Sequence, residues 1–284
     1  MEAEPQTDAA ADRRLRFACG TATTHRYNPA FERLVPRRTR AATRAGTPVA
    51  GHSLPSTILS FFVPVHRDGW KFLAIAAAAA LVFLMLWAPL GWLLVLVALY
   101  IAYFFRDPDR VTPIREGLVV SPADGRVSAI ERVRPPPELG FGIEERQRIS
   151  VFLSVFDVHI NRAPVAGRIS RSVYVPGAFV NAALDKASAD NERRVLVITT
   201  AAGMEIGVVQ IAGLIARRIV TIKDEGDTVA IGERIGLIRF GSRVDVYLPP
   251  GRTALVSVGQ TAIAGETVLA DLASSEAERE ARLG

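Results

Sequence analysis

One stretch of this 284-residue sequence, residues 72–105, is almost entirely apolar and limits what the chain can fold into. It consists of two apolar runs, residues 72–87 and 92–105, with Pro89 in the break between them. As a single helix the stretch would measure about 51 Å, well beyond the roughly 30 Å hydrocarbon core of a bilayer. Proline also interrupts a helix in its interior. The sequence therefore predicts two short helices joined as a hairpin.

The flanks of this hairpin indicate a membrane anchor. Basic residues on both sides predict that both ends stay on the cytoplasmic face of the membrane: Arg67, Lys71, Arg106 and Arg110. Aromatic residues typical of membrane interfaces lie near the expected helix ends: Trp70, Trp87, Trp92 and Tyr103. The alternative is a helical pair buried in a soluble core, but no polar face appears along the stretch. We therefore expect residues 54–110 to anchor the protein in the cell inner membrane.

The net charge of +5 is concentrated in an N-terminal tail. Residues 1–50 hold nine arginines and five acidic residues, whereas the remainder holds 25 basic and 24 acidic residues. This distribution argues against a nucleic-acid partner and predicts a disordered basic tail over residues 1–53. The single cysteine, Cys19, argues against a disulfide framework or a cysteine-based metal site.

From residue 117 onward the pattern changes to short alternating runs bounded by Gly, Pro and Asp, which predicts a mainly β, barrel-sandwich-like domain over residues 111–272. The expected strands are 117–121, 126–133, 148–155, 167–175, 194–200, 204–212, 217–223, 234–240, 243–248, 254–258 and 266–271. Helical patterns are confined to about 178–188 and to 273–283, within a polar C-terminal tail (273–284). This domain contains one histidine, His159, so we expect no multi-histidine metal site.

Three residues of the β domain offer the elements of nucleophilic catalysis. Ser242 follows Gly241 at a bend, and a glycine carbonyl is sterically open to attack by the serine hydroxyl if a base lies beside it. The ordinary alternative is a turn in which the hydroxyl bonds its own backbone. His159 would supply the base and Asp124 would orient it, although each also fits a structural role. Their separation in the sequence leaves open whether the three meet.

Several motifs resemble those of phosphatidylserine decarboxylases of the short bacterial and archaeal form. They follow in order over roughly residues 60–272: Phe104-Phe105-Arg106-Asp107-Pro108, Ser121-Pro122-Ala123-Asp124-Gly125, Phe156-Asp157-Val158-His159-Ile160-Asn161-Arg162, Gln210-Ile211-Ala212-Gly213 with Ala216-Arg217-Arg218-Ile219, Gly232-Glu233-Arg234-Ile235-Gly236, and Phe240-Gly241-Ser242-Arg243. The usual Leu-Gly-Ser-Thr cleavage motif reads Phe-Gly-Ser-Arg here, which leaves the scissile pair intact. Longer family members carry a second histidine where this chain has Phe156, so no role of that histidine transfers.

The resemblance implies a proenzyme that cleaves itself between Gly241 and Ser242 into a β chain (1–241) and an α chain (242–284) that form a heterodimer. Ser242 would become a covalent pyruvoyl group, the cofactor, which forms a Schiff base with phosphatidylserine in the bilayer and acts as electron sink while carbon dioxide leaves. The family's apparatus maps onto His159 as base and Asp124 as the residue that holds the imidazole. The product would be phosphatidylethanolamine, made without a metal.

Two other functions remain as alternatives. Pro-Ala-Asp-Gly-Arg-Val and Glu-Gly-Asp-Thr-Val-Ala-Ile-Gly-Glu resemble phrases of barrel-sandwich carriers, but neither Lys186 nor Lys223 has the flanking pattern of a carrier lysine. A membrane serine hydrolase would use the same three catalytic residues, but the Gly-x-Ser-x-Gly motif is absent from the sequence. Lys186, Arg217 and Arg218 are candidates for phosphate binding because they are basic and lie in the matched region.

Overall fold

The structure is a computed structural model that describes residues 63–177, 191–213, 218–239 and 241–274, and in the tail residues 276, 277, 279, 281 and 282. Several predictions lie outside these described residues: the tail over 1–53, the helix near 178–188, and the candidates Lys186 and Arg217.

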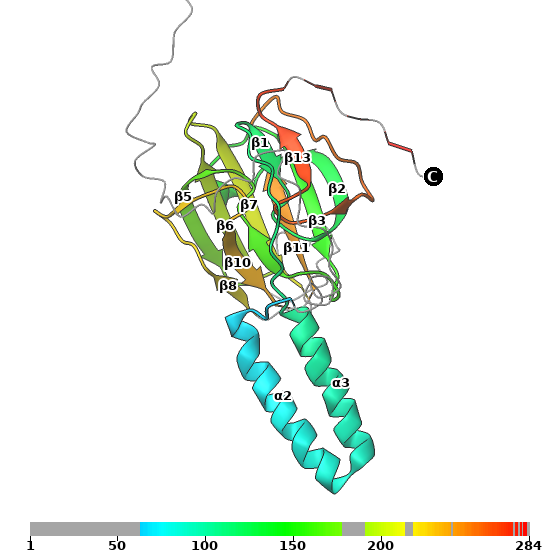
Figure 1. Ribbon diagram of the computed structural model, residues 1–284. Coiled ribbons are helices and arrows are strands. Elements are labelled where there is room, and N and C mark those ends of the chain that lie inside the picture. Colours follow the sequence, from blue (N-terminus) through cyan, green and yellow to red (C-terminus); the bar gives the residue numbers. More distant parts are fainter. Residues whose placement is uncertain are drawn as a thin grey trace, which may run out of the picture. The chain divides into compact units, whose positions relative to one another are not determined.

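Two helices form the expected hairpin, α2 (Arg67–Leu86) and α3 (Ala88–Phe104) (Figure 1). The break between them is shorter than predicted, because Trp87 alone separates them. Pro89 lies in the first turn of α3, where the N–H that proline lacks would have no helical partner. By length and composition α2 could cross a membrane, whereas α3 is shorter, with 17 residues. The predicted helical pair before the β domain is therefore confirmed.

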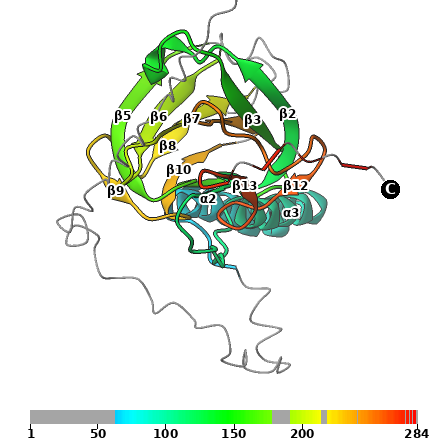
Figure 2. The same ribbon diagram turned by 90° about the horizontal axis from the view of Figure 1, so that it is seen from above.

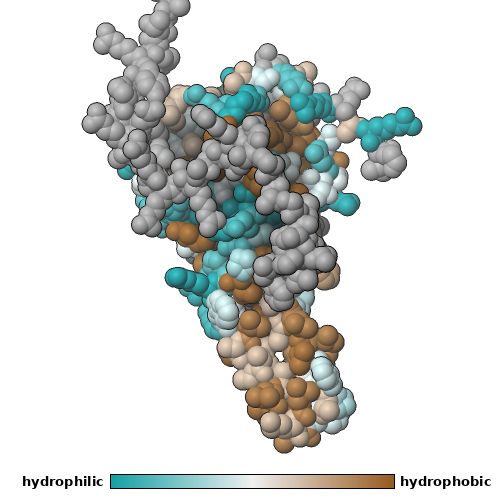
Figure 3. Space-filling model, viewed as in Figure 1, coloured by the Kyte–Doolittle hydropathy of each residue, from teal (hydrophilic) through white to brown (hydrophobic). Residues whose placement is uncertain are grey.

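The hairpin presents apolar side chains to its surroundings, and its surface is mostly hydrophobic in Figure 3. The exposed apolar residues include Ile75, Leu81, Val82, Met85, Leu86, Leu93, Leu96 and Leu99. Soluble proteins rarely expose a continuous apolar patch of this kind without a partner surface. The exposure argues against the alternative of a helical pair buried in a soluble core.

The β domain is built on one antiparallel sheet of eight strands in the order β12-β2-β3-β11-β7-β6-β5-β9. Its strands are β2 (Gly125–Val133), β3 (Arg146–Leu153), β5 (Gly167–Val175), β6 (Arg193–Thr199), β7 (Glu205–Ala212), β9 (Thr228–Val229), β11 (Ser242–Tyr247) and β12 (Thr261–Ala262). Seen from above, the sheet curls into an open half-barrel (Figure 2). The predicted mainly β fold is confirmed.

Two smaller antiparallel sheets complete the domain. One pairs β1 (Leu118–Val120) with β13 (Val268–Asp271), and the other has the order β4-β10-β8, made from β4 (Ile160–Arg162), β10 (Arg234–Ile238) and β8 (Ile219–Thr221). A short 3-10 helix, η2, spans Pro137–Leu139. The main hydrophobic core contains residues of the curled sheet together with residues of β1 and β13.

Some predicted elements differ from the structure. Residues 254–258 form no strand: Ala254 makes an isolated bridge with Ala270, and its N–H donates to the side chain of Gln147 at 2.8 Å. The described residues of the C-terminal tail form no helix, because a short polar segment without a packed apolar face gains too little to fold as one. Strands β4, β9 and β12 were not predicted, since two or three residues are too few to show an alternating pattern.

Candidate active site

Ser242 begins β11, the strand that lies between β3 and β7. The residue is 0% exposed, and its Oγ has no hydrogen-bond partner among the described residues. The structure therefore does not show the ordinary alternative, a turn hydroxyl bonded to its own backbone. A buried polar group without a partner costs about 1–3 kcal/mol, and such exceptions are often found at reactive sites. Ser242 is thus a buried hydroxyl that the fold leaves unused.

Gly241 places an accessible carbonyl next to this hydroxyl. Its φ of +61° lies in the left-handed region that favours glycine, and a Cβ at this position would meet no described atom within 4 Å. The absence of a side chain leaves the carbonyl carbon open to approach. The Gly241–Ser242 bond therefore combines a free nucleophile with an unhindered target.

His159 connects this peptide bond to the loop before β4. Its Nδ1 lies 2.9 Å from the main-chain carbonyl of Asp157, and the N–H of Gly241 donates to its Nε2 at 3.3 Å. An amide N–H can only donate, so Nε2 must carry the lone pair and Nδ1 the proton. The basic nitrogen of His159 therefore faces the Gly241–Ser242 peptide.

The surroundings of His159 keep its imidazole neutral. Burial lowers its pKa from 6.5 to about 4, with a smaller lowering from Arg106, while Asp157 opposes the shift through its carbonyl and its charge. The ring of Phe104 contributes to the burial, with its centroid 4.2 Å from that of the imidazole. At neutral pH the side chain is therefore in the form that can accept a proton.

Asp124 does not make the expected contact with His159. Its Oδ2 accepts from Arg110 at 2.5 Å and its Oδ1 accepts from the N–H of Ala264 at 2.7 Å. Burial raises the pKa of Asp124, and the Ala264 N–H and Arg110 oppose this shift. The position beside Nδ1 is instead taken by the Asp157 carbonyl. Asp124 joins the segment that follows the hairpin to the loop after β12, and its catalytic role stays a prediction.

A buried amide pair joins β7, a neighbour of β11 in the curled sheet, to β4 of the smaller sheet. Gln210 of β7 donates through Nε2 to Oδ1 of Asn161 on β4 at 2.7 Å. Both side chains are almost completely buried, and Asn161 Nδ2 and Gln210 Oε1 have no partner among the described residues. Asn161, Gln210 and Asp157 all lie within the sequence motifs described above, but no role was predicted for any of them. The available signal was that Asn161 and Asp157 lie in the same motif as His159 and that Gln210 lies in another matched motif.

The base of the hairpin packs against the strands that carry this site (Figure 1). Phe104 and Phe105, 0% and 1% exposed, pack in one cluster with Ile160 of β4 and Leu237 of β10. Arg106 donates to the carbonyl of Phe156 at 2.7 Å, which ties the end of α3 to the loop before His159. The candidate site therefore lies where the apolar helices meet the β domain.

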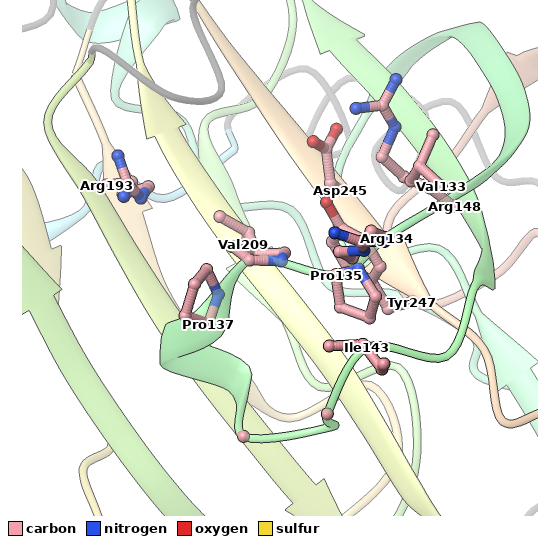
Figure 4. Close-up of a pocket in the computed structure, with 13 residues that line it drawn as sticks. Val133, Arg134, Pro135, Pro137, Ile143, Arg148, Arg193, Val209, Asp245 and Tyr247 are labelled. Carbon is pink, nitrogen blue, oxygen red and sulfur yellow. The ribbon is translucent and has the colours of Figure 1, made fainter.

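A cavity of about 780 Å³ is separate from this site (Figure 4). It is lined by Asp245 and Tyr247, which point to the opposite face of β11 from Ser242 because side chains alternate along a strand. Neither Ser242 nor His159 lines it. In the described part of the chain, we find no group of three His, Cys, Asp or Glu side chains placed to hold a metal ion.

Comparison with known proteins identifies the family. Residues 97–270, which include Asp124, His159 and Ser242, match the model of the phosphatidylserine decarboxylase family. The chain belongs to this family. It is also 58% identical over 220 residues to the phosphatidylserine decarboxylase proenzyme of Cereibacter sphaeroides, an alignment that covers 78% of this chain and 95% of that protein. The resemblance found in the sequence motifs is confirmed.

Proposed function

We propose that this protein is a proenzyme that cleaves itself between Gly241 and Ser242 and then decarboxylates phosphatidylserine with a pyruvoyl group formed at position 242. The observation that carries the proposal is the placement of His159 Nε2 at the peptide bond whose serine hydroxyl is buried and unpartnered. Membership of the phosphatidylserine decarboxylase family, and the proenzyme name of the C. sphaeroides relative, support it.

Self-cleavage begins when Nε2 of His159 exchanges its contact with the Gly241 N–H for the Ser242 hydroxyl and takes its proton. The oxygen then attacks the Gly241 carbonyl carbon, and His159 delivers the proton to the Ser242 nitrogen as the C–N bond breaks. An ester and a free amine result. Loss of the Ser242 α-proton expels Gly241 as a carboxylate and leaves dehydroalanine. Water then replaces the nitrogen, which leaves as ammonia, and the pyruvoyl carbonyl remains.

The residues around position 242 fit this group. Because the Ser242 hydroxyl has no hydrogen-bond partner in the described part of the chain and Gly241 has no side chain, both reacting atoms are open to reaction. A pyruvoyl group at this position would supply a conjugated carbonyl able to accept the electrons of the bond to the departing carboxylate. His159, held through Nδ1 by Asp157 and shielded by Phe104, can take up and return protons at this position.

The fold would keep the two cleaved chains together. Residues 242–284 contribute β11, which hydrogen-bonds to β3 and β7 along its whole length, and every residue of β11 is buried. They also contribute β12 and β13, which pair with β2 and β1. A heterodimer of residues 1–241 and 242–284 follows from these pairings.

The hairpin would place the site at the membrane surface. Phosphatidylserine has two acyl chains and stays in the bilayer, so the enzyme must reach its headgroup there. The exposed apolar residues of α2 and α3 provide the inserting surface, and the site lies at their base. The charges that flank the hairpin favour the cytoplasmic face of the inner membrane.

Neither alternative function is favoured by a specific feature. A serine hydrolase must expose its nucleophile to an external substrate, whereas Ser242 is 0% exposed and part of a central strand. A carrier module needs a free lysine at a hairpin tip, whereas Lys223 pairs with Glu233 at 3.0 Å.

The proposal is tested by intact-mass analysis of purified protein. Wild type should appear as two chains, the smaller one blocked at its N-terminus and reactive toward a carbonyl reagent, and should convert phosphatidylserine to phosphatidylethanolamine. Ser242→Ala should remain one inactive chain. Ser150→Ala is the matched control, because Ser150 is also a buried, unpartnered hydroxyl of the same sheet and should be cut normally. Uncut yet fully active protein would contradict the proposal.

A further inference from the structure

A second cavity, of about 440 Å³, lies at the base of the hairpin. Its lining residues are Asp68, Lys71, Arg218, Ile219, Val220, Thr221 and Arg239. Three cations and one carboxylate give these side chains a net charge of +2. The cations come from the start of α2, the residue before β8 and the residue after β10, so the fold brings them together from distant parts of the sequence.

The side chain of Arg239 is held in this cavity but makes no hydrogen bond to the described residues. Its side chain is only 14% exposed, and its buried Nε has no partner among the described residues. The nearest carboxylate oxygen, on Asp68, is 3.6 Å from a terminal nitrogen, which is longer than a normal hydrogen bond. The guanidinium lies 5.4 Å from the ring centroid of Phe72, and Lys71 lies 5.2 Å from the same centroid. A fixed guanidinium with unused donors suits a phosphate.

The cavity adjoins the candidate active site. Arg239 lies three residues before Ser242, so their Cα atoms are at most about 11 Å apart. The preceding residue, Ile238, donates its N–H to the main-chain carbonyl of His159 at 3.2 Å. A series of ring contacts also connects the two places: Phe72 with Phe105 at 5.7 Å, Phe105 with Phe104 at 5.0 Å, and Phe104 with His159 at 4.2 Å.

The cavity also lies at the edge of the apolar part of the hairpin. Lys71 is followed at once by Phe72 and the apolar remainder of α2, so a bilayer that covers the hairpin would end near this turn. Basic residues at this level meet lipid phosphates rather than acyl chains. The location therefore fits an anion that arrives with the membrane.

On the basis of the proposed function, we propose that this cavity binds the phosphodiester of the phospholipid substrate. Arg239 donates hydrogen bonds to its oxygens, and Lys71 and Arg218 add positive charge. The negative charge of Asp68 repels an anion. When phosphate binds, Arg239 exchanges its long contact with Asp68 for shorter hydrogen bonds to the phosphate oxygens. Because the serine headgroup is joined to this phosphate, the bound phosphate directs it toward position 242. The cavity thus positions the substrate and takes no part in self-cleavage.

Steady-state kinetics of the mature full-length protein in neutral detergent micelles test this proposal. Arg239→Gln should be cut and should carry the carbonyl group, but its KM for phosphatidylserine should rise about tenfold to a hundredfold, with kcat little changed. Lys71→Gln should raise KM less, and Arg239→Lys should recover part of the loss. The matched control is Arg132→Gln, an exposed arginine of β2 that should leave KM unchanged. If Arg239→Gln and Lys71→Gln are both cut and both keep the KM of wild type, the inference is overturned.

Two further arms identify the source of the phosphate. Glycerophosphoserine, the soluble headgroup, should inhibit wild type competitively. For Arg239→Gln its inhibition constant should rise by the same factor as the KM for phosphatidylserine. Sedimentation with phosphatidylcholine vesicles, with and without phosphatidylglycerol, should show no difference between the two proteins. A variant that loses binding to anionic vesicles but keeps its inhibition constant would show that these cations bind bulk lipid, which contradicts the inference. Absence of cleavage or decarboxylation in wild type would instead contradict the proposed function.

Discussion

The rate of self-cleavage should change little between about pH 7.5 and pH 5 and should halve only near pH 4. Burial lowers the pKa of His159 to about 4, and the neutral imidazole is the form that accepts the Ser242 proton. About nine-tenths of the imidazole is then neutral at pH 5, compared with about 3% for a histidine with a pKa of 6.5. The two cases differ about thirtyfold in rate at pH 5.

The same pKa shift lowers stability in acid, and this effect must be separated from catalysis. Because the pKa of His159 is lower in the folded chain than in the unfolded chain, the unfolded chain binds more protons between about pH 6.5 and pH 4. Stability is therefore lost as the pH falls through this window, by about 3 kcal/mol in total. Ser242→Ala keeps the imidazole but cannot be cut, so it reports the loss of stability in the absence of cleavage.

The assay starts from precursor denatured in urea and diluted into detergent micelles at a series of pH values. Cleavage is followed by the appearance of the 43-residue fragment 242–284. Circular dichroism of Ser242→Ala at the same pH values shows where the protein is folded. In folded protein, a rate midpoint near pH 6.5 would mean that the imidazole is exposed to water, and the burial argument would fail. A rate that does not depend on pH down to pH 3 would exclude His159 as the base.

Three further outcomes follow from the structure. His159→Ala should slow cleavage about 10²- to 10⁴-fold, measured by gel densitometry, because general-base loss has this size; complete processing at the wild-type rate would contradict the mechanism. Asp124→Asn and Arg110→Gln should slow cleavage by equal amounts, and less than His159→Ala does, since the two side chains form one ion pair away from the imidazole. A far larger effect of Asp124→Asn than of Arg110→Gln would instead support a direct contact of Asp124 with His159. Substitution of Met85, Leu86 and Leu96 by serine should release the protein from membranes at high salt while cleavage continues, whereas sedimentation with lipid would place the anchor elsewhere.

The parts of the fold that the sequence predicts are those specified by local patterns. The apolar runs predict both helices, and the alternation over residues 167–175 and 243–248 predicts β5 and β11 to within a residue. Strands β4, β9 and β12 exist because neighbouring strands pair with them, and two or three residues carry no period of their own. Residues 254–258 alternate but lack neighbouring strands along their length, so the pattern gives no strand.

The candidate site was predictable to the level of its residues but not of its contacts. The motifs indicate Ser242 and His159, and the fold brings the imidazole to the peptide bond before Ser242. The group that holds the imidazole was not predictable, because it is the main-chain carbonyl of Asp157, and a carbonyl has no signature in a sequence. An aspartate is the usual orienter of a catalytic histidine, so a contact with His159 was predicted for Asp124, whereas in the structure Asp124 pairs with Arg110.

Anchoring and catalysis meet in the last residues of α3. Phe104 is 0% exposed, and its ring lies against His159, so the helix that would enter the membrane also supplies part of the burial that lowers the pKa of the base. Deletion of residues 1–105 would therefore do more than release the β domain, since it would also open the imidazole to water and raise its pKa toward 6.5. Substitutions far from the base of the hairpin avoid this second effect. The base stays largely neutral even at pH 5 because the end of the hairpin packs against it, which makes the hairpin a structural part of the site as well as its proposed attachment to lipid.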